Sequence, residues 1–170
     1  MIHEIDLNIE EICEWIPEDF DKQFTRSILE MFVKHDLIYK IRTDDVRLRI
    51  YCYIKKSKET LIINTKGYRY GEYEIQMRIT NPAILTKLDE YPANISEQIL
   101  TADNCRKCWN CGKEYVFTYQ GTEYRKCCML CANFTFHHFT EEDCDTLLRM
   151  IYEEICFSIP KQKRHLLDKQ

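Results

Sequence analysis

The chain has 170 residues, of which 45% are hydrophobic and 12% aromatic, and its formal net charge is −4. These values suit one domain with its own core, or one domain with a small appended module. The negative charge argues against a protein that coats nucleic acid or membranes by bulk charge. The chain lacks an apolar run of about 18 residues and begins with an acidic stretch, which argues against a membrane span and a signal peptide. We therefore expect a cytoplasmic protein that does not enter the membrane.

The first 36 residues predict helices. A short helix over residues 7–15 should end before Pro17. Residues 19–36 carry apolar side chains at three- and four-residue spacing, which predicts a longer amphipathic helix with His35 at its end. We expect His35 to be a helix-end or core residue rather than a ligand.

The periodicity then changes to two, as in strands. The expected strands are residues 38–42, 46–56, 59–66 and 73–79, with a turn at 43–45. Short turns between them predict an antiparallel sheet of three to four strands with one buried face.

Helices return in the second half of the chain. A helix should start at Asn81-Pro82, break near Pro92 and resume through Leu100. Residues 134–138 alternate and suit a third strand of a ribbon, and a helix with a capping-box-like start at Thr140 should run to about Phe157. The predicted class is α+β, with flanking helices, a C-terminal zinc ribbon and a terminal helix. The expected parts are a body over 1–104, a ribbon over 105–139, a helix over 140–158 packed on the body, and a polar tail over 159–170.

Ten cysteines in a reducing compartment indicate metal ligands and buried thiols rather than disulfides. Two pairs with the C-x2-C spacing lie on either side of a predicted hairpin that turns at Gln120-Gly121. Such pairs bind one zinc ion from two tight turns. The predicted ligands are Cys108, Cys111, Cys128 and Cys131. This knuckle–hairpin–knuckle–strand order over residues 105–139 resembles the zinc-ribbon class, which implies metal binding but no particular activity.

Several details of the metal site stay open. Cys105 and Cys127 are alternative ligands, and the C-x2-C-x2-C run also resembles part of an iron–sulfur cluster motif. His137 and His138 are further candidates, although we expect them to be strand residues beside the ribbon. A closed four-cysteine zinc site stabilises a fold. The remaining cysteines lie on apolar faces, so we expect them to be buried thiols: Cys13, Cys52, Cys144 and Cys156.

Charge is unevenly distributed along the chain. Residues 1–36 hold three Lys/Arg and ten Asp/Glu, residues 37–80 hold ten and five, and residues 105–139 hold five and two. The second predicted strand has a face of cations and tyrosines, formed by Arg47, Arg49, Tyr51, Tyr53 and Lys55. Such a face can hold single-stranded nucleic acid, or it is an ordinary solvated face. Further residues that could extend it are Lys66, Tyr68, Arg69, Arg106, Lys107, Lys113, Arg125 and Lys126.

The motifs that would name a reaction are absent from the sequence. No glycine-rich phosphate loop, H-E-x-x-H or G-x-S-x-G can be found, so enzymatic activity stays uncertain. We expect a zinc-binding protein with a structural four-cysteine site that acts as a binding or regulatory module, with nucleic acid or another protein as its partner. The alternatives are a small-molecule sensor or enzyme with an aromatic pocket for an apolar ligand, and an iron–sulfur or thiol-redox protein.

Overall fold

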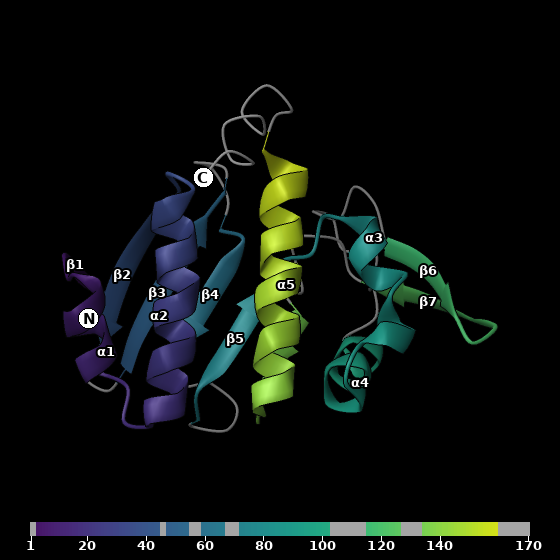
Figure 1. Ribbon diagram of the computed structural model, residues 1–170, viewed down its shortest axis with the longest axis horizontal. Helices are drawn as coiled ribbons and strands as arrows, with labels where there is room; N and C mark the ends of the chain where they lie inside the picture. Colours follow the sequence, from purple (N-terminus) through teal and green to yellow (C-terminus); the bar gives the residue numbers. More distant parts are fainter. Residues whose placement is uncertain are drawn as a thin grey trace.

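The computed structural model describes residues 3–44, 47–54, 59–66, 72–102, 115–126 and 134–159. This part of the chain is an α+β fold with a six-stranded antiparallel sheet, a separate two-stranded hairpin and five α-helices (Figure 1). The strands of the large sheet, in spatial order, are β1 (His3–Ile5), β2 (Ile38–Asp44), β3 (Arg47–Tyr53), β4 (Leu61–Asn64), β5 (Glu74–Met77) and β8 (Phe134–Phe136). Among the described helices, none is long and apolar enough to cross a bilayer.

The predicted α+β class is confirmed, but the prediction of three to four strands is wrong. The strands β1 and β8 extend the sheet on its two sides, and β2 runs through Asp44, where a turn was predicted. The expected third ribbon strand over residues 134–138 is wrong as well, because Phe136 pairs with Ile75 of β5. Phe134 and Phe136 are buried, so their alternation extends the main core rather than the ribbon.

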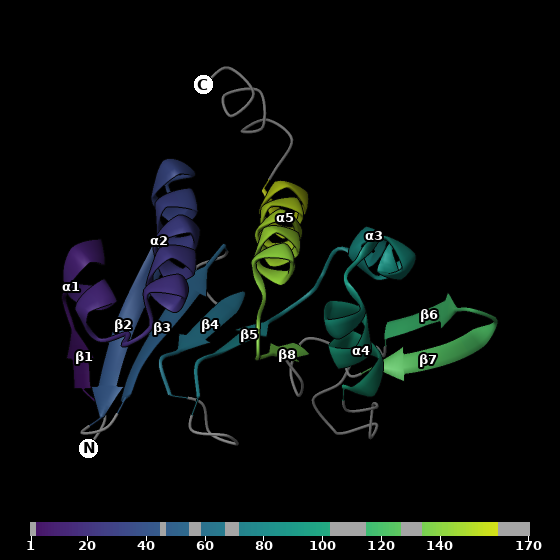
Figure 2. The ribbon, with the colours of Figure 1, turned by 60° about the horizontal axis from the view of Figure 1, so that its bottom comes forward.

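One face of the large sheet, which we call the inner face, packs against α1 (Ile9–Glu14), α2 (Asp19–Lys34) and α5 (Glu141–Ser158) (Figures 1 and 2). The outer face points away from these three helices. Residues that alternate along each strand supply the inner face, and they form one continuous apolar core with the helices. The main strand contributors to this core are Ile41, Leu48, Ile50, Cys52, Leu61, Ile63, Ile75, Met77, Phe134 and Phe136.

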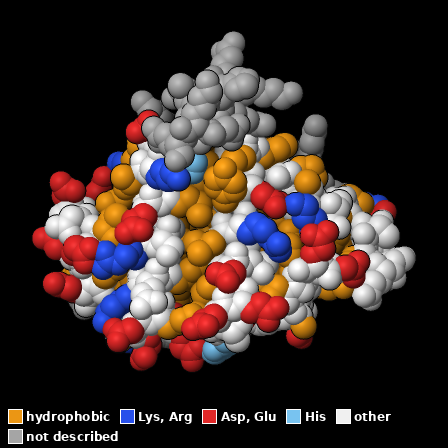
Figure 3. Space-filling view, in the orientation of Figure 1, with side chains coloured by type: hydrophobic (Ala, Val, Ile, Leu, Met, Phe, Trp, Pro, Cys, Tyr) orange, Lys and Arg blue, Asp and Glu red, His pale blue; other side chains and the backbone are white. Residues whose placement is uncertain are grey.

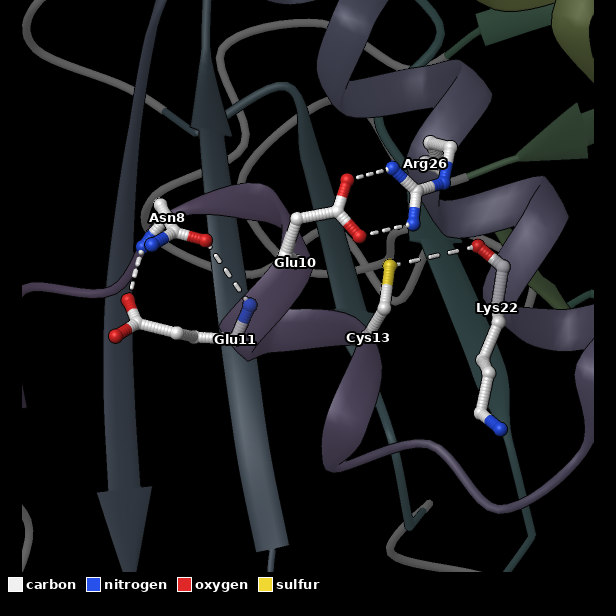
Figure 4. A network of polar contacts seen from close by, with 6 residues as sticks. All are labelled: Asn8, Glu10, Glu11, Cys13, Lys22 and Arg26. Carbon is white, nitrogen blue, oxygen red and sulfur yellow. Dashed lines mark hydrogen bonds and ion pairs between the residues drawn. The ribbon is translucent and has the colours of Figure 1, made fainter.

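Both predicted N-terminal helices are confirmed, and polar contacts join them (Figure 4). Asn8 and Glu11 form a capping box, in which each side chain accepts a hydrogen bond from the backbone N–H of the other. The guanidinium of Arg26 on α2 donates two hydrogen bonds to the carboxylate of Glu10 on α1. His35 caps the C-terminus of α2 and is buried, as predicted.

The predicted C-terminal helix and its capping box are confirmed in α5. Thr140 and Asp143 exchange the two hydrogen bonds of the box. Further along, the fully buried carboxylate of Glu154 accepts hydrogen bonds at 2.9 Å from the backbone N–H groups of Thr80 and Asn81. These bonds join the middle of α5 to the segment that leaves β5.

The remaining elements gather beyond the β8 side of the sheet (Figure 2). They are α3 (Pro82–Leu85), a 3-10 turn η1 (Leu88–Glu90), α4 (Ala93–Thr101) and the hairpin of β6 (Tyr115–Tyr119) and β7 (Thr122–Lys126). As predicted, Asn81 caps a helix with proline in its first turn, and the chain breaks near Pro92. The predicted hairpin turn is also present, because Gln120 and Gly121 both have positive φ (47° and 77°).

Candidate functional site

The predicted zinc ligands cannot be placed, because all six clustered cysteines lie outside the described residues. Within the described ranges, no group of three or more His, Cys, Asp or Glu side chains is arranged to hold a metal ion. Of the two candidate histidines, His138 places Nδ1 3.1 Å from Glu72 Oε2. The His137 and His138 rings contact each other edge to face, with centroids 4.7 Å apart. Neither is assigned as a metal ligand.

The cysteine-containing stretches 103–114 and 127–133 are flanked by described residues, three of which lie near one another. The buried ammonium of Lys126, the last residue of β7, donates hydrogen bonds of 2.6 Å to the carbonyl oxygens of Leu100 and Ala102. Lys126 also pairs with Tyr115 across the hairpin. The residues Ala102, Tyr115 and Lys126 therefore lie close together, and each adjoins one end of a cysteine-containing stretch.

The four other cysteines are free thiols, and the prediction that they are buried holds for three of them. Cys13, Cys52 and Cys144 are buried, whereas Cys156 is only half-buried. Burial raises the pKa of the Cys144 thiol to about 12, and burial also raises the pKa of the Cys52 thiol. These two thiols stay protonated near neutral pH, so they are poor nucleophiles.

The clearest polar surface lies on the outer face of β2 and β3. The alternation along β3 places Leu48, Ile50 and Cys52 in the core, so the intervening side chains point outward: Arg47, Arg49, Tyr51 and Tyr53. The antiparallel register adds two cations from β2, because Lys40 lies opposite Tyr51 and Arg42 lies opposite Arg49. We call Lys40, Arg42, Arg47, Arg49, Tyr51 and Tyr53 the cationic-aromatic face.

Contacts within this face bring the cations close to the tyrosine rings. The Arg42 guanidinium lies over the Tyr51 ring, with Cζ 4.9 Å from the ring centroid, as in a cation–π pair. Burial raises the pKa of the Tyr53 hydroxyl, and Glu59 adds to this shift, whereas Arg42 and Lys40 oppose it. Tyr53 is therefore neutral at physiological pH, with its hydroxyl able to donate a hydrogen bond.

Among the described residues, the ammonium of Lys40 forms an ion pair at the protein surface. Its Nζ atom lies 2.9 Å from Glu4 Oε1, and both side chains are about half exposed (47% and 53%). The hydrogen bond from Lys40 lowers the pKa of Glu4. Exposed pairs of this kind contribute about 0–1 kcal/mol, so an incoming anion can compete with Glu4 at small cost.

A buried polar network borders the cationic-aromatic face on its β4–β5 side. The side-chain amides of Asn64 and Gln76 both donate hydrogen bonds of 3.0 Å to Glu74 Oε1. Asn64 and Glu74 are only 2% and 3% exposed. Because Asn64 and Glu74 alternate with inner-face residues of β4 and β5, the sequence could have predicted that they lie on the outer face. It carries no signal that they are buried there.

The structure describes only three of the residues that were predicted to extend the cationic surface, namely Lys66, Arg125 and Lys126. Lys55, Tyr68, Arg69, Arg106, Lys107 and Lys113 lie outside the described residues. Lys66 is exposed at the end of β4, and Arg125 pairs with Glu123 on the distant hairpin. Lys126 does not extend the surface, because it is buried and donates to backbone carbonyls. Conversely, Lys40 and Arg42 were missed. Their alternation with Tyr39 and Ile41 is the sequence signal that could have assigned them to the outer face, but the register that sets them beside β3 comes from the structure.

The helix-covered side differs in charge from the cationic-aromatic face. Figure 3, which views that side, shows many acidic side chains, interspersed basic ones and hydrophobic side chains between the helices.

No protein-family model matches this chain, and searches of curated proteins and of solved structures find no match. The function is therefore argued from the chemistry of the residues themselves.

Proposed function

We propose that this chain is a binding module for single-stranded nucleic acid, and that the cationic-aromatic face is its interface. The observation that carries the proposal is the register of β2 and β3, which sets Lys40 and Arg42 beside Tyr51 and Tyr53. Proteins hold single strands in this way, because cations pair with phosphates and bases stack on aromatic rings. The net charge of −4 does not oppose local binding, since residues 1–36 alone hold ten of the acidic residues.

The alternative is that long charged side chains and tyrosines merely solvate an exposed sheet. Fluorescence anisotropy with a labelled ten-nucleotide single strand, measured between about 50 and 200 mM salt, separates the two. For true binding, log K should fall with log salt by about 0.7 for each phosphate contacted. An affinity that does not change with salt would reject the proposal.

Paired variants make the same experiment specific to this face. The double substitution Lys40→Gln and Arg42→Gln should weaken binding about ten- to hundredfold and reduce the salt slope by about 1.4. The matched control is Lys22→Gln with Arg149→Gln, which removes the same charge from helices on the other side of the sheet. Equal losses in the two double variants would indicate binding by bulk charge rather than by the proposed interface.

We propose in addition that Cys108, Cys111, Cys128 and Cys131 bind one structural Zn²⁺, with Cys105 and Cys127 as second choices. The proximity of Ala102, Tyr115 and Lys126 supports this, because these described residues directly flank the two cysteine-containing stretches. Four thiolates would supply a closed site that stabilises this end of the molecule.

Elemental analysis and an absorbance spectrum of protein purified without added metal test the site. One zinc per chain and no visible absorbance would support the closed ribbon. Iron with a visible chromophore would favour the iron–sulfur alternative, and metal-free protein with six reactive thiols would leave the redox alternative. Cysteine-rich metal sites and protonated buried thiols suit a reducing compartment, so we propose the cytoplasm as the location.

The alternative of a small-molecule sensor or enzyme gains no support from two tyrosines of the described core. The Tyr73 hydroxyl is within 2.8 Å of Thr25 Oγ1, and the Tyr91 hydroxyl donates to the carbonyl oxygen of Ile84. Both rings are buried in the core. Their hydroxyls are already engaged, so they do not offer polar contacts to a ligand.

A further inference from the structure

Arg78 follows β5 and points to the outer face of the sheet. Its neighbours Met77 and Ile79 are both 1% exposed and belong to the core, so the alternation turns Arg78 the other way. Its backbone N–H donates to the carbonyl oxygen of Thr60 at 2.8 Å, which continues the β4–β5 register by one residue. By the β3–β4 register, Thr60 in turn lies across from Tyr53.

The Arg78 side chain is half-buried but makes no hydrogen bond or ion pair with any described residue. Its Nε atom is buried without a hydrogen-bond partner. By contrast, several other cations of the described chain form ion pairs, such as Lys22 with Asp19 and Lys87 with Glu153. Burying one N–H group of a guanidinium without an acceptor is unfavourable, and an anion beside the guanidinium would offset part of this cost.

Among the described residues, the neighbouring polar groups do not supply that anion. Glu74 is four residues earlier on the same strand, and its Oε1 atom already accepts from Asn64 and Gln76. Tyr53 lies two strands away, at about 10 Å between backbones, because adjacent strands are about 4.8 Å apart. A tetrahedral oxyanion between Arg78 and Tyr53 could therefore contact the guanidinium and the tyrosine hydroxyl at once.

We propose that Arg78 binds a phosphate group on the outer face, next to Tyr53. An arginine fork suits this ligand because two of its N–H groups can donate to two phosphate oxygens. This inference rests on the proposed function in that it takes the phosphate from a nucleic acid strand. It adds a second cationic side to the interface, so that Tyr51 and Tyr53 lie between Arg42 and Arg78.

The experiment uses the full chain and compares Arg78→Gln with Arg78→Lys and the control Arg149→Gln. The anisotropy assay with the ten-nucleotide strand should show about a tenfold loss for Arg78→Gln and a salt slope reduced by about 0.7. Arg78→Lys should recover part of the affinity, and Arg149→Gln should leave both quantities unchanged. Backbone amide NMR spectra of each variant confirm that the core is intact. Unchanged affinity and slope in Arg78→Gln would overturn the assignment while leaving the proposed function in place.

A second readout separates the two proposals. The Nε–H resonance of Arg78 is followed by NMR while inorganic phosphate, and then the oligonucleotide, is added. A shift with phosphate but no binding of the oligonucleotide would support an anion site fed by free phosphate and would reject the nucleic-acid function. No shift with either ligand would overturn the phosphate assignment itself.

Discussion

The two faces of the six-stranded sheet are built by alternate residues of the same strands, and along β3 they differ sharply in chemistry. On β3, Leu48, Ile50 and Cys52 are fully buried, whereas the intervening side chains are cationic or aromatic and half-buried. The helices α1, α2 and α5 cover the inner face of the sheet, which carries the buried set, and do not cover the outer face (Figure 2). The difference teaches that adjacent residues of one strand can be tested separately for stability and for binding.

The largest contrast should come from the adjacent pair Ile50 and Tyr51. Ile50→Ala leaves a cavity in the core and should lower the free energy of unfolding by about 3–4 kcal/mol. Tyr51→Ala, on the outer face, should lower the free energy of unfolding by only about 1 kcal/mol. Its main effect should be weaker oligonucleotide binding. Urea denaturation measures the first effect and anisotropy the second. Similar stability losses for both variants would show that the outer face is also part of the core.

A similar contrast should hold between adjacent glutamates of α5. Glu154→Ala leaves the buried N–H groups of Thr80 and Asn81 without an acceptor, and should cost about 3 kcal/mol. Its control is Glu153→Ala, which removes a part-exposed ion pair with Lys87 at 2.8 Å and should cost less than about 1 kcal/mol. Urea denaturation at constant pH checks both values, and equal losses would contradict the anchoring role of Glu154.

A smaller effect concerns Asp21, near the start of α2 on the helix-covered side. Burial raises its pKa from 3.8 to about 6, with a further contribution from Glu18. Because the folded protein binds this proton more tightly than the unfolded chain, stability should fall as pH rises from about 4 to 6. Asp21→Asn should therefore stabilise the protein at pH 7 by about 1 kcal/mol, since solvent screens part of the burial penalty.

The test of Asp21 is urea denaturation of both proteins across the pH range. The advantage of Asp21→Asn should be complete above pH 6 and should shrink to nothing as pH falls toward the unfolded pKa. An advantage that persisted unchanged at pH 3.5 would show that ionisation of Asp21 is not its cause.

The smallest effect on stability is expected for Lys40→Gln. This substitution breaks the exposed ion pair with Glu4, so the free energy of unfolding should change by less than about 1 kcal/mol. Thermal unfolding in parallel with the wild-type chain measures it. A larger loss would mean that the cations of the outer face support the fold, which would weaken the argument that they serve a partner.

Much of the fold could be predicted from local patterns. Three-residue and four-residue apolar spacing located α2 and α5, and alternation located β2 to β5. Local cap and turn chemistry was equally readable, as in the Thr140–Asp143 box and the Gln120–Gly121 turn. These features depend on residues close together in the chain, so the amino-acid order suffices to predict them.

Strand partnership depends instead on contacts between distant residues. The segment Phe134–Phe136 alternates in a way that suits the hairpin or the large sheet, and packing of both rings into the main core selects β5. The three residues of β1 are too few for a periodic pattern. For the same reason, the neighbours of the predicted Arg47–Lys55 face could not be identified before the register of β2 and β3 was known.

The sequence by itself determined the fold class, the main helices and strands, and the alternation that separates an apolar from a cationic face on β3. Only the tertiary structure decided that Arg42 lies over Tyr51, that Lys126 is buried against α4, and that the buried Nε of Arg78 has no hydrogen-bond partner among the described residues. The physical reason is that periodicity sets the direction of each side chain within its element. Packing between elements sets which side chains meet, and whether a charge ends up paired, buried or open to a ligand.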